Sequence, residues 1–317
     1  MTELTPVKSS TPATKPGTPE QEAYLEKLVA AGLLVPGGVD GLFGRGRDFE
    51  HVITQFEAFV TRRGADENAT VLRFPPLLSR AHYQQTDHVR GFPDLVGCVH
   101  SFVGGDAEHA SLINAVESGG DWSGFFTASD FVFTPAACYP VYPISTGTIG
   151  PEGLTYDVLS YCFRHEPSRD PARMQLFRQR EYVRIGSAQQ SVAFRDKWAE
   201  RAHAMFLEAG LPAEIVVAND PFFGRAGRML VANQRDQELK LEVVIPITST
   251  AKPTACASAN YHQDHFGHPF AIQQADGSHA HTACIGFGLE RIALALFMVH
   301  GLELRNWPAG VRRLLDV

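Results

Sequence analysis

The stretch LSYCFRHEPSRDPARMQLFRQREYVRIG, residues 159–186, decides the fold. An apolar run leads to Arg164 and Glu166, and a second strand-like run returns after an arginine-rich loop. Residues i and i+2 of a strand share a face, so Arg164 and Glu166 are expected to point the same way. Guanidinium groups hold phosphate oxygens bidentately, so this hairpin, with Arg173 and Arg178 on its returning arm, predicts a mononucleotide site. An ion-paired hairpin on a solvated face is the alternative for this stretch taken alone.

Composition places the chain among ordinary globular proteins. It has 317 residues, of which 44% are apolar and 20% charged, and a net charge of −7. That length suffices for one large core or two modest ones. A net negative charge argues against a broad basic surface for nucleic acid, although the arginine-rich hairpin still supplies a local basic patch.

The five cysteines are an odd number and contain no Cys-x-x-Cys pair. This usage is typical of reduced thiols in a cytosol rather than of a disulfide framework. The sequence contains no apolar run of about 18 residues, so no membrane span is expected. The first residues also lack the apolar region of a signal peptide. We therefore expect a cytoplasmic protein.

The first 17 residues are rich in Thr, Pro, Ser and Lys and predict a disordered tail, residues 1–17. Residues 18–317 are then expected to form one domain. Thr18 begins its first helix as the cap, followed by Pro19 at the first helical position. This helix is predicted to stop near Gly37-Gly38.

The remaining pattern alternates helices and strands in a mixed order. Helices are predicted over residues 49–60 with an end at Gly64, 79 onward, 108–117, a short one capped by Thr134 with Cys138 in its first turn, 196–210 and 289–300. Strands are predicted over residues 71–78 with a break at Pro75-Pro76, 98–103, 215–218, 229–233, 239–247 and 282–288. Such an order favours an α+β fold, in which helices flank an antiparallel sheet.

A second signal lies at residues 286–291, GFGLER. Two glycines in a strand let another backbone or a flat ring approach closely. Arg291 falls in the first turn of the following helix, where exposed N–H groups already favour an anion. By itself this GxGxxR pattern is weak, but together with the arginine-rich hairpin it becomes specific.

These two segments resemble motifs 2 and 3 of class II aminoacyl-tRNA synthetases. Phe163-Arg164-His165-Glu166 and the returning Arg178 are similar to motif 2, and residues 286–291 are similar to motif 3. Asn260, Asp264 and Phe266 resemble a segment of seryl-tRNA synthetases that lies between them. The resemblance covers residues from Phe74 to the C-terminus.

The resemblance implies an ATP site on an antiparallel sheet. Arg164 and Glu166 would hold the α-phosphate and the adenine, and Arg164 and Arg291 would act in catalysis. The implied ATP contacts are Arg164, Glu166, Arg173, Met174, Arg178, Lys240, Glu242 and Arg291. Attack of a carboxylate on the α-phosphate needs positioning and charge neutralisation, so arginines and Mg²⁺ suffice without an acid–base pair.

The chain departs from the family where many relatives carry Thr-x-Glu, whose glutamate meets the α-amino group of the substrate. Here the sequence reads Thr134-Pro-Ala-Ala-Cys138. Cys138, Glu181 and Cys284 form a candidate metal site, as in the zinc-dependent seryl-tRNA synthetases of methanogens. Cys284 shares a strand face with the two motif 3 glycines by the period of two. Two thiolates and a carboxylate suit Zn²⁺ and leave a fourth position for a neutral amine.

Two alternatives compete with this metal site. Separated cysteines are most often small buried apolar residues. His262, His265 and His268, at a spacing of three, are a rival ligand set, although the surrounding Asp264 and Gly267 favour a loop with surface or hydrogen-bonding histidines.

Small residues precede the Asn260 segment. Ala255, Cys256, Ala257 and Ser258 predict a tight pocket for the side chain of the amino acid, which with Glu181 as a further contact favours glycine or alanine. Relatives carry Glu-x-x-Ser as a Mg²⁺ site here, whereas this chain reads Thr254-Ala-Cys-Ala257, which leaves its Mg²⁺ ligands undefined.

The whole pattern is similar to the bacterial amino acid:[carrier protein] ligases, truncated relatives of seryl-tRNA synthetases. This resemblance implies an aminoacyl thioester on the phosphopantetheine of a small acidic carrier protein, a homodimer, and no charging of tRNA, since residues 18–317 are used by the catalytic core. The carrier is expected to bind near Arg195 or Arg201, close to the predicted helix that contains Trp198. A reduced seryl-tRNA synthetase and a non-catalytic amino-acid-binding paralogue are the alternatives.

Overall fold

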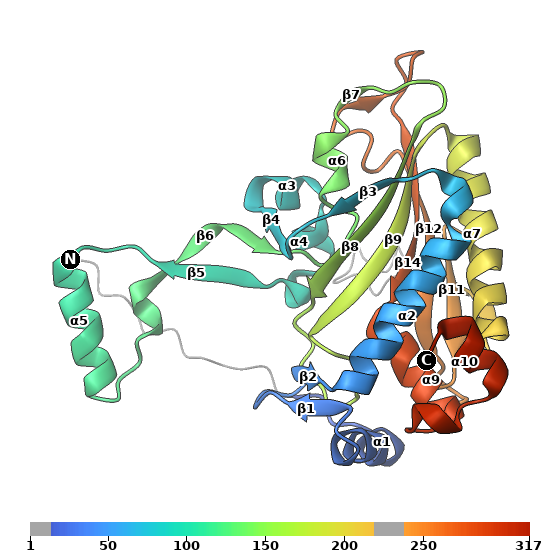
Figure 1. Cartoon of the computed structure of the whole chain (residues 1–317). Helices are drawn as coiled ribbons and strands as arrows, with labels where there is room; N and C mark the ends of the chain where they lie inside the picture. Colours follow the sequence, from blue (N-terminus) through green and yellow to red (C-terminus); the bar gives the residue numbers. More distant parts are fainter. Residues whose placement is uncertain (1–13, 219–237) are drawn as a thin grey trace.

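The computed structural model describes residues 14–218 and 238–317. Its body is a seven-stranded sheet in the order β10-β11-β12-β14-β9-β8-β3 (Figure 1). All neighbours are antiparallel except β3 and β8. The strands are β3 (Thr70–Arg73), β8 (Leu154–Phe163), β9 (Leu176–Gly186), β10 (Glu214–Ala218), β11 (Lys240–Ile245), β12 (Thr254–Gln263) and β14 (His281–Gly288). The predicted α+β class is confirmed. The strand predicted over residues 229–233 lies outside the described residues.

Helices cover one face of this sheet (Figure 1). They are α2 (Arg47–Arg63), α7 (Ala188–Glu208), α9 (Leu289–His300) and α10 (Ala309–Leu315). The core between helices and sheet is aromatic at its centre, where the ring of Phe287 on β14 lies 6.4 Å from Phe56, 6.1 Å from Trp198 and 6.4 Å from Phe206. Trp198 is completely buried, so its role is packing.

The first helix is shorter than predicted. α1 (Pro19–Ala30) begins with Thr18 as the expected cap, and Gln21 completes a capping box, but the helix ends well before Gly37. Gly32 has a φ of +69° and the N–H of Leu33 returns to the carbonyl of Leu28. A glycine in this left-handed conformation ends the helix, and the chain continues into a hairpin of β1 (Leu34–Pro36) and β2 (Phe43–Arg45).

The predicted disordered tail is corrected in part. Residues 1–13 lie outside the described ranges, but residues 14–17 are placed by the arginine-rich loop. The N–H of Lys15 donates to the carbonyl of Pro167, and its carbonyl accepts from the N–H of Arg169. This pairing attaches the N-terminal segment to the loop between β8 and β9.

A smaller sheet projects away from the body and ends in an exposed helix (Figure 1). It contains β4 (Leu77–Ser79), β5 (Cys98–Phe102) and β6 (Phe126–Phe133), in the order β4-β6-β5, and α5 (Asp106–Glu117) follows β5. The remaining elements are α3 (Arg80–Gln85), α4 (His88–Gly91), α6 (Val141–Ile144), β7 (Gly147–Thr148), β13 (Ile272–Gln273) and 3-10 turns at Ala65–Glu67, Pro93–Leu95, Ser123–Phe125 and Leu304–Asn306. The expected homodimer stays a prediction.

A buried ion cluster joins the helices to the sheet. Glu290 on α9 accepts from the backbone N–H of Arg178 at 2.7 Å and from its Nε at 3.0 Å, and it lies 3.1 Å from Nη2 of Arg45. Both terminal nitrogens of Arg178 donate to Glu50 of α2 at 2.7 Å. The side chain of Glu290 is 2% exposed, so its charge depends on these two guanidinium groups.

Replacing Glu290 by Gln leaves Arg45 and Arg178 without a shared counter-charge. We expect the free energy of unfolding to fall by about 3–5 kcal/mol, because an uncompensated buried charge remains. Urea denaturation measures this change. Glu303→Gln, which removes the solvent-exposed pair with Arg305, is the control and should cost less than about 1 kcal/mol. Similar losses in both variants would contradict a structural role for the ion cluster.

Candidate active site

The two faces of β9 have different partners. Across the antiparallel pairs, Glu181 lies opposite Gly286 and Val183 opposite Cys284. Residues directly opposite each other share a face, so Cys284, Gly286 and Glu181 all lie on the face away from α2 and α7. The strand face predicted for Cys284 and the glycines is therefore confirmed. A Cβ at Gly286 would lie 2.8 Å from Nε2 of Gln179, so any larger residue there would require the side chain of Gln179 to move.

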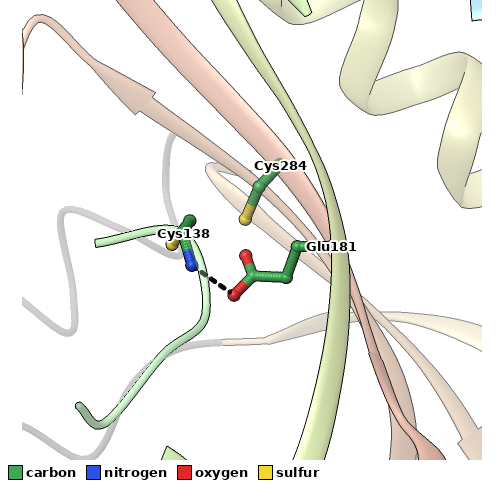
Figure 2. A group of neighbouring side chains, drawn as sticks. All are labelled: Cys138, Glu181 and Cys284. Atoms are coloured by element: carbon green, nitrogen blue, oxygen red, sulfur yellow. Dashed lines mark hydrogen bonds between the residues drawn. The ribbon is translucent and has the colours of Figure 1, made fainter. Parts of the chain in front are cut away.

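Cys138, Glu181 and Cys284 converge on this face (Figure 2). Their ligand atoms all lie within 4.8 Å of one another, and all three residues are buried. Within residues 14–218 and 238–317, no other group of His, Cys, Asp and Glu side chains has this arrangement. The chain thus brings together two sulfurs and one carboxylate from a loop and two strands.

Burial governs the protonation of these groups. Burial raises the pKa of Cys138 well above its ordinary value, and the hydrogen bond with Cys284 adds to this effect. Burial also raises the pKa of Glu181. The hydrogen bond with Cys138 lowers the pKa of Cys284, but burial and the nearby Glu181 carboxylate outweigh it and the pKa is raised. The metal-free site therefore favours its protonated forms, and a cation would have to displace protons.

The segment of Cys138 is a turn rather than the predicted helix. α6 begins only at Val141, three residues after Cys138. The N–H of Cys138 donates to Oε1 of Glu181 at 3.0 Å, and the hydroxyl of Thr134 donates to the carbonyl of Ala136. Glu181 therefore fixes the turn that carries Cys138, and the hydroxyl of Thr134 does not cap a helix.

The strand prediction for Arg164 and Glu166 is wrong. β8 ends at Phe163, and the N–H of Glu166 returns to the carbonyl of Arg164 in a tight turn. The Nε of Arg164 donates to the carbonyl of Pro135, and its guanidinium lies 5.4 Å from the ring centre of Phe177. The two side chains come near the site from a loop, so the period of two does not apply to them.

Three guanidinium groups nevertheless gather at this loop. Glu166 pairs with Arg173 at 3.1 Å. Arg291 donates from Nε to the carbonyl of Ala172 and from Nη1 to that of Ala255. Burial lowers the pKa of Arg291, and the positive charges of Arg164 and Arg173 lower it further. Arg173 also lies 3.9 Å from a carboxylate oxygen of Asp170. Three guanidinium groups beside two carboxylates are an arrangement that can hold an anion.

Two predicted ATP contacts lie elsewhere. Arg178 lies on the opposite face of β9 from Glu181, where Glu50 and Glu290 hold its guanidinium on the helix side. The prediction that Arg178 contacts a phosphate is therefore corrected. Its double ion pair raises its pKa despite burial, and this cation is already neutralised. The side chain of Met174 is buried in the helix-side core with its sulfur near Arg45, so we assign it to packing.

The predicted pocket of small residues is corrected as well. Ser258 lies opposite Gly286 and shares the site face, but Ala257 lies opposite Phe287 and faces the helices. Cys256 is buried in the same helix-side core, and burial raises its pKa to about 12. Ala255 contributes its carbonyl to Arg291. The register with β11 shifts between Ala255 and Ala257, which interrupts the alternation at Cys256. Cys256 and Ala257 therefore both pack on the helix side, and the four residues do not line one pocket.

Lys240 and Glu242 of β11 lie on the site face, since they stand opposite Asn260 and Ser258. Their side chains form an ion pair of 3.1 Å. Sequence reasoning missed Gln179, which lies two residues before Glu181 on β9 and therefore shares its face. That spacing was the available signal.

The three histidines of the rival set do not form a site. His262 belongs to β12, where its Nδ1 lies 3.0 Å from the hydroxyl of Thr282, whereas His265 and His268 are exposed in the following turn. The prediction of hydrogen-bonding or surface histidines is confirmed.

Comparisons with known proteins identify the family and the fold. No protein-family model matches the chain. The chain is 42% identical over 302 residues to a protein of Bradyrhizobium diazoefficiens named amino acid--[acyl-carrier-protein] ligase 2. The matched region covers 95% of this chain and 90% of that protein. The chain belongs to the amino acid--[acyl-carrier-protein] ligase family. A second ligase of this family from the same organism, named ligase 1, is 43% identical over 282 residues, 88% of this chain and 86% of that protein.

More distant relatives of this ligase family share its fold. The type-2 serine--tRNA ligase of Methanopyrus kandleri is 28% identical over 202 residues, 59% of this chain and 38% of that protein. The structure superimposes with a TM-score of 0.80 on M. kandleri SerRS in complex with A. aeolicus tRNASec, at 19% identity, covering 92% of this chain and 60% of that one. Seryl-tRNA synthetase from Pyrococcus horikoshii complexed with ATP gives 0.68 at 14% identity, covering 93% and 62%. The fold is the class II catalytic core.

Surface features bear on the predicted carrier contact. Arg201 is paired with Asp66 and Glu67, and Arg195 with Asp196 and the carbonyl of Glu238. These two guanidinium groups are therefore already engaged within the chain. None of the described helices is long and apolar enough to cross a membrane.

Glu181 makes the stability of the metal-free protein depend on pH. Its folded pKa lies above the unfolded value of 4.5, so its contribution is complete below about pH 4.5 and is lost as the pH rises through the folded pKa. Glu181→Gln keeps an acceptor for Cys138 without this titration. We expect urea denaturation in chelator to show a smaller loss of stability between pH 5 and pH 7.5 in this variant than in the wild type. An equal loss in both would assign the pH dependence to other groups.

Proposed function

We propose that the chain activates a small amino acid with ATP and transfers the aminoacyl group to the phosphopantetheine thiol of a small acidic carrier protein. The observation that carries this proposal is the convergence of Cys138, Glu181 and Cys284 on the sheet face away from α2 and α7, with Arg164 donating to the carbonyl of Pro135 in the segment that leads to Cys138. The carrier-protein ligase names of the two relatives from B. diazoefficiens support the reaction class.

In the first step, a carboxylate oxygen of the amino acid attacks the α-phosphorus of ATP. The bond from this phosphorus to the bridging oxygen breaks, and pyrophosphate leaves with the electron pair. Arg164, Arg173 and Arg291 would neutralise the charge that spreads over the phosphate oxygens, and Mg²⁺ would accompany the ATP. Glu166 holds Arg173 at 3.1 Å and so positions it.

In the second step, the thiol of the carrier attacks the carbonyl carbon of the adenylate. The sulfur loses its proton to solvent, the thioester forms, and AMP leaves. Neither step requires a general acid–base pair in the protein, which fits a site whose charged residues are mainly arginines.

Cys138, Glu181 and Cys284 fit a Zn²⁺ ion. Two sulfurs and one carboxylate oxygen within 4.8 Å of one another match its preferred donors and leave a coordination position open. When bound there, the ion would accept the neutral α-amine of the amino acid as a ligand. Glycine or alanine is the proposed substrate, since Gln179 shares the strand face of Glu181 and Gly286 and the segment of Cys138 lies beside Glu181 and Cys284 (Figure 2).

The metal can be tested with Cys284→Ala. We expect the purified wild type to contain about one equivalent of zinc, and the variant to lose both the zinc and amino-acid-dependent ATP–pyrophosphate exchange. Cys98→Ala, which changes an exposed free cysteine, should leave both unchanged. A wild type with full exchange activity and no zinc would overturn the metal assignment.

The same assay identifies the substrates. Exchange should occur with glycine or alanine, and the labelled amino acid should pass to a phosphopantetheine-bearing carrier protein rather than to tRNA. Robust charging of tRNA with serine would instead favour a seryl-tRNA synthetase, in line with the similarity to the M. kandleri enzyme. Binding of an amino acid without exchange would favour a non-catalytic paralogue.

The different surroundings of Arg291 and Arg178 predict different changes in the free energy of unfolding when each is replaced by Gln. Arg291→Gln relieves repulsion from Arg164 and Arg173 but removes two donors to backbone carbonyls. The free energy of unfolding should therefore change by less than about 1 kcal/mol, while exchange falls by about 10²-fold. Arg178→Gln breaks pairs with Glu50 and Glu290 and should lower the free energy of unfolding by about 3 kcal/mol. Exchange kinetics and urea denaturation measure both. A strong loss of stability in Arg291→Gln would contradict its role in binding an anion.

A further inference from the structure

Of the three histidines at a spacing of three, His262 lies close to the three-ligand group of Cys138, Glu181 and Cys284. His262 lies near the end of β12, and its Nε2 is 3.7 Å from Sγ of Cys284. The amide Nδ2 of Asn260, two residues earlier on the same strand, is 3.5 Å from the same sulfur. Two nitrogen donors from one strand therefore approach a single thiol.

The ring of His262 is held on two further sides. Its Nδ1 lies 3.0 Å from the hydroxyl of Thr282, which is completely buried, and the ring packs edge-on against Phe266 at 5.1 Å between centroids. If the hydroxyl of Thr282 donates to Nδ1, the ring proton stands on Nε2, the nitrogen that points to Cys284. This tautomer makes His262 a hydrogen-bond donor to sulfur.

The position of His262 distinguishes a donor from a metal ligand. Neither ring nitrogen belongs to the set of atoms that lie mutually within 4.8 Å, which comprises Cys138, Glu181 and Cys284. A fourth protein ligand would also fill the position that an amine needs. His262 therefore approaches the sulfur of Cys284 from outside the three-ligand group.

We propose that His262 is a positioning residue which, with Asn260, donates to the sulfur of Cys284 and holds it as an oriented thiolate for a zinc ion. This inference rests on the metal site of the proposed function. Hydrogen bonds to a thiolate favour the anionic form and reduce the negative charge that it donates, so the bound ion stays a stronger acceptor for an amine. Thr282 acts one step further out, by setting the tautomer.

The test uses the full chain, stripped of metal and titrated with Zn²⁺ against a chromophoric chelator. His262→Leu should bind Zn²⁺ about 10–100-fold more weakly than the wild type, the range for loss of a hydrogen bond to a ligand. His262→Gln places an amide N–H near the position of Nε2 and should recover most of this affinity. Thr282→Val, which removes the hydroxyl with little change of shape, should fall between the two.

His265→Leu is the matched control. His265 lies in the same segment and its ring also packs against Phe266, at 4.8 Å, but it is exposed. Its variant should bind Zn²⁺ as tightly as the wild type. Urea denaturation of the metal-free proteins checks that each variant folds. If His262→Leu does not fold, the Zn²⁺ affinities of the wild type, His262→Gln and Thr282→Val still test the proposal, because they should differ in the expected order rather than be equal.

Titration with Co²⁺ supplies a readout independent of activity. Its thiolate-to-cobalt absorption band should shift in His262→Leu, because the sulfur loses a hydrogen bond, while the coordination number stays the same. Unchanged affinity and an unchanged band in His262→Leu would overturn the proposal, and so would a change of coordination number, which would make His262 a ligand. A wild type that binds no Zn²⁺ would instead remove the metal site, and the role of His262 with it.

Discussion

Strand β9 carries a buried ionisable side chain on each of its faces, and the structure depends on how each one is satisfied. On the helix side, Arg178 is enclosed by Glu50 and Glu290, which ties α2 and α9 to the sheet. On the other side, Glu181 accepts from the backbone of Cys138 and holds the turn beside Cys284. A strand can present both faces in this way only because successive side chains alternate. One rigid element therefore anchors the helix layer and positions the proposed metal ligands, so the two cannot shift independently.

Sequence patterns predicted the starts and ends of helices and strands well where capping residues and glycines mark them. Thr18 starts α1, Gly64 ends α2, and residues 286–291 run from strand into helix as expected. The grouping of Cys138, Glu181 and Cys284 came from resemblance together with a missing glutamate, because local pattern does not place a turn against two strands. A period of two states which residues share a face, but not where a strand ends or which face meets the helices.

The errors follow from that limit. β8 stops at Phe163, so Arg164 and Glu166 reach the site from a turn. Arg178 lies inside the strand and faces the helices, although its place in the arginine-rich stretch suggested a phosphate contact. Ala257 faces the core for the same reason, since it alternates with Ser258. Each of these outcomes is fixed by tertiary packing, which a single stretch of sequence does not contain.

The loop between β8 and β9 holds like charges together, and this arrangement costs free energy unless other contacts offset it. Arg291 of α9 donates to the carbonyl of Ala172, and Gln21 of α1 donates to Asp170 at 2.9 Å, so the loop is held by both helices. Pairing with Lys15 adds a backbone attachment. These contacts fix the loop that carries the arginines, so little reorganisation would remain for the proposed binding of an anion. Lys15, which composition alone assigned to a disordered tail, thus helps to hold the loop that carries the proposed anion-binding arginines.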